Sequence, residues 1–275
     1  MTSEPSFDAL LPPDMAAKVE AVGVTKAGLP LARMIPLGIL AGAFIGLGAH
    51  FSTVITADTA LSPGISRLLG GLVFSLGLVL VVVSGAELFT GNTLIVVATV
   101  DRKVRVRALL RNWFVVYGSN FVGAAATALL VHASGRLDAG DGSVGARAVA
   151  IAEAKSGLTF GNAVASGILA NALVCLAVWM TLSARSLVDR VVVIVPPITA
   201  FVAAGFEHSV ANMYFFPVAL FHGTPDGSPA TWSAFLLDNL VPVTLGNIVG
   251  GAVLVGLVYW FVYLRRAGSQ SVHTR

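Results

Sequence analysis

Six apolar stretches, each long enough to cross a bilayer as a helix, dominate this sequence and leave little choice of fold. A membrane-spanning helix needs about 20 mostly apolar residues. Only 11% of the 275 residues are charged, against about 25% in a typical soluble domain, so the chain could not cover a water-facing surface. We therefore expect an all-α membrane protein with six transmembrane helices, near residues 31–53, 66–100, 112–132, 158–182, 190–220 and 239–263.

The basic residues predict the orientation of these spans. Thirteen of the 17 Lys and Arg residues fall before the first span, after the second, after the fourth or in the tail, and four fall on the other side. Since basic loops stay in the cytoplasm, both termini are expected there. The first 30 residues show no signal peptide. Asp14 to Val22 predicts a short amphipathic helix ending at Gly23, placed either on the membrane surface or under a pore as a gating element.

Three motifs recur in the same order in the two halves of the chain. Residues 38–41 (Gly-Ile-Leu-Ala) reappear at 167–170, and two further sets recur at identical spacing: Gly85, Glu87 and Asn92 with Gly205, Glu207 and Asn212, and Asn112, Asn120 and Gly123 with Asn239, Asn247 and Gly250. Because each half holds three spans, an odd number, the halves must have opposite topology, an arrangement that is typical of transport proteins.

The repeat divides the chain into five predicted parts. A cytoplasmic amphipathic segment covers residues 1–30, the first three-span repeat 31–132, and an extracytoplasmic loop 133–157. The second repeat covers 158–263 and a cytoplasmic tail 264–275.

The second and fifth spans are predicted to be broken, at residues 84–92 and 203–209, where glycine and charged residues interrupt the apolar run. Unwound backbone is tolerated in a bilayer only where it is buried in protein or lines a watery cavity. Glu87 and Glu207 are interpreted mainly as caps that accept from free N–H groups of the following half-helix, with a direct transport role as the alternative. We expect a further set of amides to bond broken backbone or neighbouring helices: Asn92, Asn120, Asn171, Asn212 and Asn247.

His208, inside the second break, is the leading candidate for a pathway residue. A lone histidine in an apolar protein is often a satisfied core residue, but its place at a break favours a pore-lining role, and its titration range suits proton exchange. Thr90 could bond to the imidazole or to a solute. Phe74, Leu78 and Phe201 precede the breaks, either as ordinary packing or as apolar constrictions.

Other classes of protein are disfavoured. The single cysteine, Cys175, permits no disulfide framework within one chain, and the five histidines form no paired metal or haem motif. We therefore expect no metal, no cofactor, no nucleic-acid partner and no enzymatic activity. A non-transporting scaffold would not account for two breaks in matching positions.

The motifs resemble those of the formate/nitrite transporter family over nearly the whole chain. The similarity is carried by residues 7–12 (FDALLP), 70–77 (GGLVFSLG), 85–92 (GAELFTGN), 167–171 (GILAN), 205–212 (GFEHSVAN) and 242–247 (PVTLGN). Residues 174–179 (VCLAVW), with the fifth-span and N-terminal motifs, are most similar to the formate-channel branch. The resemblance implies an aquaporin-like homopentamer in lipid, with one pore per protomer, in a bacterial inner membrane.

The same resemblance implies residue roles. His208 would be the central pore histidine, with Thr90 beside it, and Lys155 the vestibule lysine. Phe74 and Phe201 would form one constriction; Leu78, Leu88 and Phe89 would form the other and a mobile loop. Asn171 matches the family's asparagine in the fourth span. The implied substrate is formate or a similar small monovalent anion, with nitrite or hydrosulfide as the alternative because Glu87 and residues 91–92 are also common in nitrite-like relatives.

Energetics favour neutralisation of such a solute in an apolar constriction. An unpaired carboxylate in an apolar medium costs tens of kcal/mol, whereas protonating an acid of pKa near 4 at pH 7 costs roughly 4 kcal/mol. The hypothesis is that Lys155 attracts the anion and His208 supplies or relays a proton. In the competing hypothesis the anion stays charged, stabilised by the half-helix N-termini and a protonated His208.

Overall fold

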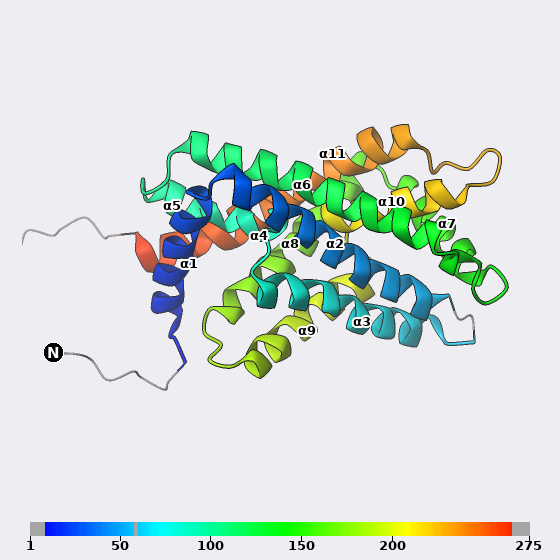
Figure 1. Cartoon of the computed structure of the whole chain (residues 1–275). Helices are drawn as coiled ribbons and strands as arrows, with labels where there is room; N and C mark the ends of the chain where they lie inside the picture. Colours follow the sequence, from blue (N-terminus) through cyan, green and yellow to red (C-terminus); the bar gives the residue numbers. More distant parts are fainter. Residues whose placement is uncertain (1–8, 58–59, 266–275) are drawn as a thin grey trace, which may run out of the picture.

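The structure is a computed structural model that describes residues 9–57 and 60–265. Within these residues the chain is helical throughout (Figure 1). The start of the predicted N-terminal segment and nearly all of the predicted tail lie outside the described residues.

The helices of the first half run from α1 to α6. They are α1 (Pro12–Ala27), α2 (Leu31–Thr56), α3 (Pro63–Ser84), α4 (Phe89–Asn92), α5 (Val96–Val100) and α6 (Val106–Ala133), with a 3₁₀ turn at Thr93–Ile95 joining α4 to α5. The second half contains α7 (Ser143–Ser156), α8 (Phe160–Thr181), α9 (Leu187–Ala203), α10 (Ser209–His222) and α11 (Val241–Ile248). π-helical turns flank α11 and join it into one helix over Ala234–Leu264.

Five helices in the described part of the chain are long and apolar enough to cross a membrane: α2, α3, α6, α8 and Ala234–Leu264. The remaining predicted span, 190–220, is divided into α9 and α10, of 17 and 14 residues. Both predicted interruptions are present. α3 ends before Gly85 (φ +73°) and α9 ends before Gly205 (φ +76°), a left-handed conformation that glycine adopts at little cost.

Close helix contacts depend on glycines at equivalent places. α2 packs on α6, and α8 packs on α11. A Cβ added at Gly123 would lie 1.9 Å from the Ile39 carbonyl oxygen, and one at Gly250 would lie 2.2 Å from that of Ile168. Only glycine permits these separations, as at other interfaces between membrane helices.

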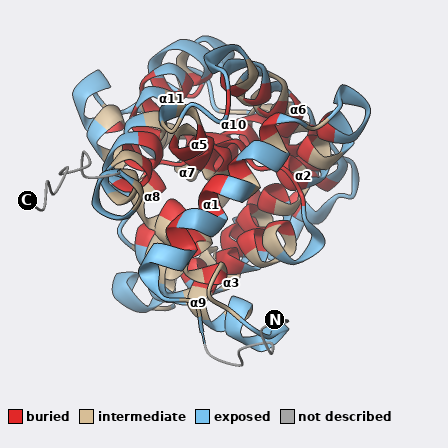
Figure 2. Ribbon diagram, turned by 90° about the vertical axis from the view of Figure 1, so that its left-hand side faces the viewer, coloured by how far each residue is buried: buried red, intermediate tan, exposed pale blue. Residues whose placement is uncertain are grey.

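The prediction for the N-terminal helix needs correction. α1 does not end at Gly23 but continues to Ala27. Gly23 is a packing residue rather than a helix end, since its lack of a side chain permits close contact with Ile95 and Ala98. Figure 2 shows α1 crossing one end of the bundle. Met15 and Val19 are buried against protein, so this face of α1 docks on the helix bundle.

The predicted loop 133–157 also differs from expectation, because most of it forms the helix α7. α7 packs against α10 and α2 and therefore presents its side chains at fixed positions. The other end of the described chain, Trp260–Leu264, contacts α1, so both ends of the described chain lie at the same end of the bundle (Figure 1).

Candidate functional site

The first break is held open by Asn120 of α6. Its side-chain Oδ1 accepts from the Phe89 N–H at 2.9 Å, and its Nδ2 donates to the carbonyls of Gly38 (2.7 Å) and Glu87 (2.9 Å). The Glu87 N–H donates to the Leu37 carbonyl at 3.1 Å. The backbone groups that the break frees are thus satisfied by neighbouring helices, as a buried polar group requires.

The second break shows the same contacts at equivalent residues. Asn247 Oδ1 accepts from the Ser209 N–H at 2.9 Å, and its Nδ2 donates to the carbonyls of Gly167 (2.8 Å) and Glu207 (3.0 Å). The Glu207 N–H donates to Ser166 Oγ at 3.0 Å. Asn120 and Asn247 therefore bond the broken backbone, as the sequence predicted.

The prediction that the two glutamates accept from free N–H groups is wrong. Glu87 accepts from Lys26 Nζ and from Asn92 Nδ2, both at 2.7 Å. Glu207 accepts from Lys155 Nζ and from Asn212 Nδ2, also both at 2.7 Å. The Phe89 and Ser209 N–H groups donate to Asn120 and Asn247 instead, and the two carboxylates form ion pairs and hold the half-helix asparagines.

The sequence analysis missed Lys26. It pairs with Glu87 at the first break as Lys155 pairs with Glu207 at the second. Asn112 links the half-helix asparagine to this lysine at the first break. Its Oδ1 accepts from Asn92 and its Nδ2 donates to the Lys26 carbonyl. Asn239 makes the equivalent bonds to Asn212 and Lys155. The spacing of Asn112 and Asn239 was visible in the sequence, but the lysines lie on α1 and α7, outside the repeated motifs.

His208 and Thr90 come together between the two breaks. His208 Nε2 lies 2.9 Å from Thr90 Oγ1, and Nδ1 accepts from the Ala211 N–H at 3.1 Å, which caps the start of α10. Because Nδ1 is an acceptor, the neutral ring carries its proton on Nε2 and donates to Thr90. His208 is 2% exposed.

The apolar candidates separate into two groups. The rings of Phe74 and Phe201 meet edge to face at 5.6 Å, and Phe201 stacks on His208 at 5.9 Å. Leu78 and Leu88 are both buried. Phe89 differs from them: its ring packs edge-on against Tyr117 and Trp113 of α6, so it lines neither of the cavities described next.

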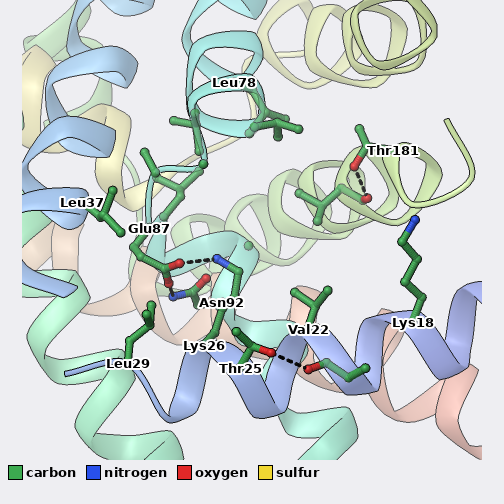
Figure 3. Close-up of a pocket in the computed structure, with 18 residues that line it drawn as sticks. Lys18, Val22, Thr25, Lys26, Leu29, Leu37, Leu78, Glu87, Asn92 and Thr181 are labelled. Carbon is green, nitrogen blue, oxygen red and sulfur yellow. Dashed lines mark hydrogen bonds and ion pairs between the residues drawn. The ribbon is translucent and has the colours of Figure 1, made fainter. Parts of the chain in front are cut away.

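Two cavities approach each other across these residues. The Lys26 cavity, of about 540 Å³, lies between α1 and the first break (Figure 3). Leu78 and Leu88 are among the residues that line it. The Lys155 cavity, of about 470 Å³, is lined by Phe74, Phe201 and His208. Leu78 follows Phe74 by about one turn of α3, or roughly 6 Å, so only this short apolar zone separates the two cavities.

Asn171 lines neither cavity. Its Nδ2 donates to the carbonyls of Thr90 (3.2 Å) and Asn247 (2.6 Å) and to Thr93 Oγ1 (3.3 Å). It therefore connects α4 to α11, and its bond to the Thr90 carbonyl helps to hold Thr90 in place. Cys175, which is also buried, lies 3.3 Å from Thr93 Oγ1. In the described ranges no group of three or more His, Cys, Asp or Glu residues could hold a metal ion.

Comparison with known proteins identifies close relatives. The sequence model of a family described as formate/nitrite transporter matches residues 13–261. The formate channel FocA of Escherichia coli K12 is 43% identical, with 96% of this chain and 98% of that protein covered. A probable formate transporter of Methanothermobacter thermautotrophicus is 40% identical, with coverages of 92% and 97%. A solved pentameric formate channel with formate bound superposes with a TM-score of 0.80 at 42% identity, covering 86% of this chain and 98% of that one.

Proposed function

The chain belongs to the formate/nitrite transporter family, and on that premise we propose that it is a multi-pass channel that conducts formate across a bacterial inner membrane. The observation that carries the proposal is the pair of cavities, each with a lysine–glutamate pair, separated by a short apolar zone at His208 and Thr90. Relatives named as formate channels match nearly the full length of the chain.

The proposed architecture is six spans in two inverted three-span repeats, over 31–132 and 158–263, in an aquaporin-like arrangement. α9 and α10 together form the fifth span. The matching hydrogen bonds at the two breaks support the repeat. We propose a homopentamer with one pore per protomer, by analogy with the solved relative described as pentameric. Large apolar side chains exposed on the spanning helices, such as Phe114 and Leu130, are available to face lipid or neighbouring protomers.

In the proposed pathway the two lysines attract the anion, one from each side. An ammonium group carries three donors, and each lysine gives only one hydrogen bond to its glutamate among the described residues. A formate ion can therefore bind the remaining donors. The paired carboxylate keeps the net charge of each pair near zero, which prevents the anion from binding too tightly to leave.

His208 is proposed to exchange a proton with the solute at the apolar zone. Its Nε2 can give a proton to the carboxylate only if Nδ1 takes one from the water of the Lys155 cavity, which His208 lines, because an imidazolate would otherwise form. The Ala211 N–H that now faces Nδ1 must turn away during that step. The same contact opposes a resting cationic His208, which disfavours passage of a charged anion held by imidazolium. Crossing as the neutral acid is thus the preferred route.

The His208→Asn variant tests this role. The Asn oxygen can take the place of Nδ1 as acceptor for the Ala211 N–H, so the start of α10 is retained while the titratable ring is lost. We expect formate uptake into proteoliposomes to fall about tenfold or more near pH 6 and to lose its pH dependence. His132→Asn, at an exposed site at the end of α6, is the matched control. An unchanged rate and pH profile in His208→Asn would contradict the relay.

Nitrite or hydrosulfide remains the alternative substrate, since both are small and monovalent and Glu87 with residues 91–92 is common in nitrite-like relatives. Flux of formate, nitrite, acetate and hydrosulfide in the same proteoliposomes decides between them. Formate should be the fastest; faster nitrite or hydrosulfide flux would overturn the assignment.

A further inference from the structure

The Lys155 cavity carries more positive charge than the ion pair with Glu207 can balance. Arg67 of α3 and Arg147 of α7 line it together with Lys155. The one carboxylate in its lining, Glu207, already accepts from Lys155, Asn212 and Asn239. Three cations and one carboxylate give this lining a net charge of +2. The lining of the Lys26 cavity has no arginine; it holds Lys18, Lys26 and Glu87, a net charge of +1.

Neither arginine forms an ion pair with a described residue. Arg147 Nε donates to Thr56 Oγ1 at 3.1 Å, which fixes the plane of the guanidinium and leaves its two terminal nitrogens without a hydrogen-bond partner among the described residues. Arg67 is exposed at the rim of the same cavity. The guanidinium N–H groups of Arg67 and Arg147 are therefore available to donate to a ligand that enters the cavity from solution.

The two guanidinium groups also act on each other. Burial, and secondarily the charge of Arg67, lower the pKa of Arg147 below its ordinary value. An anion bound between two like charges relieves their repulsion, and a planar guanidinium matches a carboxylate with two parallel hydrogen bonds.

We propose that Arg67 and Arg147 form a binding subsite for a small planar carboxylate at the mouth of the Lys155 cavity, separate from the Lys155–Glu207 pair. The inference rests on the proposed formate conduction and extends it. The subsite concentrates formate on one side of the membrane, the extracytoplasmic side in the proposed orientation, so the two directions of transport differ in apparent affinity.

Radiolabelled formate uptake tests the subsite in right-side-out and inverted bacterial membrane vesicles. For R67Q/R147Q we expect the half-saturation concentration in right-side-out vesicles to rise about fivefold at low ionic strength, with the maximal rate retained. One charge acting at about 4 Å in water has an effect of this size. The rise should shrink at 0.15 M salt, where the Debye length is about 8 Å. Because a passive pathway has the same low-concentration permeability in both directions, inverted vesicles should show an equal fall in uptake at low formate, as a lower maximal rate with an unchanged half-saturation.

Three further variants separate the explanations. R136Q removes one charge, as R67Q does, from an exposed position on the same side but outside the cavity, and it should behave as wild type. R147K keeps the charge but loses the planar guanidinium that can donate two parallel hydrogen bonds. It should give a half-saturation concentration between those of wild type and the double variant. R67Q changes an exposed side chain only, so it reports on the subsite even if the double variant folds poorly.

The outcomes distinguish the two proposals. Normal uptake by wild type with the same half-saturation in R67Q, R67Q/R147Q and R136Q would overturn the subsite and leave formate conduction standing. A rise of equal size in both kinds of vesicle would also overturn it. Absence of saturable formate uptake by wild type would overturn formate conduction and the subsite together.

Discussion

At the scale of single residues, two asparagines make a broken helix possible in a bilayer. Asn120 and Asn247 each satisfy three buried backbone groups, and water could not replace them in an apolar interior. An amide side chain suits the task because it donates and accepts at the same point. The half-helices α4 and α10 can therefore begin within the protein.

Asn120→Ala and Asn247→Ala are expected to destabilise the protein strongly. Each leaves buried backbone groups without a partner, at about 1–3 kcal/mol per group, so the free energy of unfolding should fall by about 2 kcal/mol or more. The midpoint of thermal unfolding in detergent measures this effect.

Asn162→Ala serves as the control for these two substitutions. Asn162 lies at an exposed position in the first turn of α8, and its removal should leave the unfolding midpoint nearly unchanged. Equal midpoints for Asn120→Ala and the control would contradict the role given to Asn120.

At the scale of elements, helix separation is set by glycines rather than by large side chains. The pairs α2 with α6 and α8 with α11 approach until a glycine of one helix meets a backbone carbonyl of the other. Apolar attraction between helices is weak in lipid, so close packing must hold them together. Substitution of these glycines should therefore act by steric overlap.

Gly123→Ala should prevent the normal approach of α2 and α6, because its Cβ would lie 1.9 Å from the Ile39 carbonyl oxygen. We expect a loss of about 3 kcal/mol or failure to assemble, larger than ordinary overpacking. Gly118→Ala in the same helix has open space around the added Cβ and should change stability by no more than about 1 kcal/mol. Similar detergent unfolding midpoints for the two variants would contradict this view.

The docking of α1 is expected to depend on pH through Glu20. Glu20 pairs with Lys103, and Lys103 also lies 3.4 Å from Asp101. Burial raises the pKa of Glu20 above its ordinary value of 4.5, with Asp101 adding to the rise and Lys103 opposing it. Because the folded-state pKa is raised, this contribution to docking is complete below pH 4.5 and is lost as the pH rises through the folded-state value.

Hydrogen exchange of the α1 amides, corrected for intrinsic rates, measures this dependence. Protection of α1 should fall as the pH rises above 4.5 in wild type and should change little in Glu20→Gln. The amides of α6 provide the internal reference. A Glu20→Gln protein with the wild-type pH profile would show that this carboxyl does not control docking.

At the scale of the whole molecule, the charge distribution agrees with the path of the chain. α1 and the last described turn, Trp260–Leu264, are in contact, and most basic residues precede, follow or connect spans at that end. The Lys26 cavity opens beside α1. These features support a cytoplasmic placement of this end, with the Lys155 cavity facing the opposite side.

Fusion reporters test this orientation. Green fluorescent protein fused after Arg275 should fluoresce, since it folds in the cytoplasm, and alkaline phosphatase inserted at Gly140 should be active outside it. The exchanged pair of reporters is the control and should be silent. Activity of the exchanged reporters would reverse the proposed orientation and with it the side assigned to each cavity.

Much of the fold and part of the candidate site could be predicted because they depend on local composition. The apolar stretches, the glycines at the breaks and the recurrence of Asn120 at Asn247 are properties of short segments. The proximity of Thr90 to His208 followed from placing one on each break. The contacts of Phe89 and Asn171 could not be predicted from the sequence, since they depend on which neighbouring helix each side chain meets.

The sequence by itself determined that the chain is an apolar helical protein with two interruptions at matching positions, because the bilayer leaves no other way to satisfy the backbone. Only the tertiary structure decided what the charged residues do. The ion pairs of Lys26 with Glu87 and of Lys155 with Glu207 join residues 61 and 52 positions apart. Long flexible side chains reach across helix boundaries, and the pairing depends on how α1 and α7 pack over the breaks, which no local pattern records.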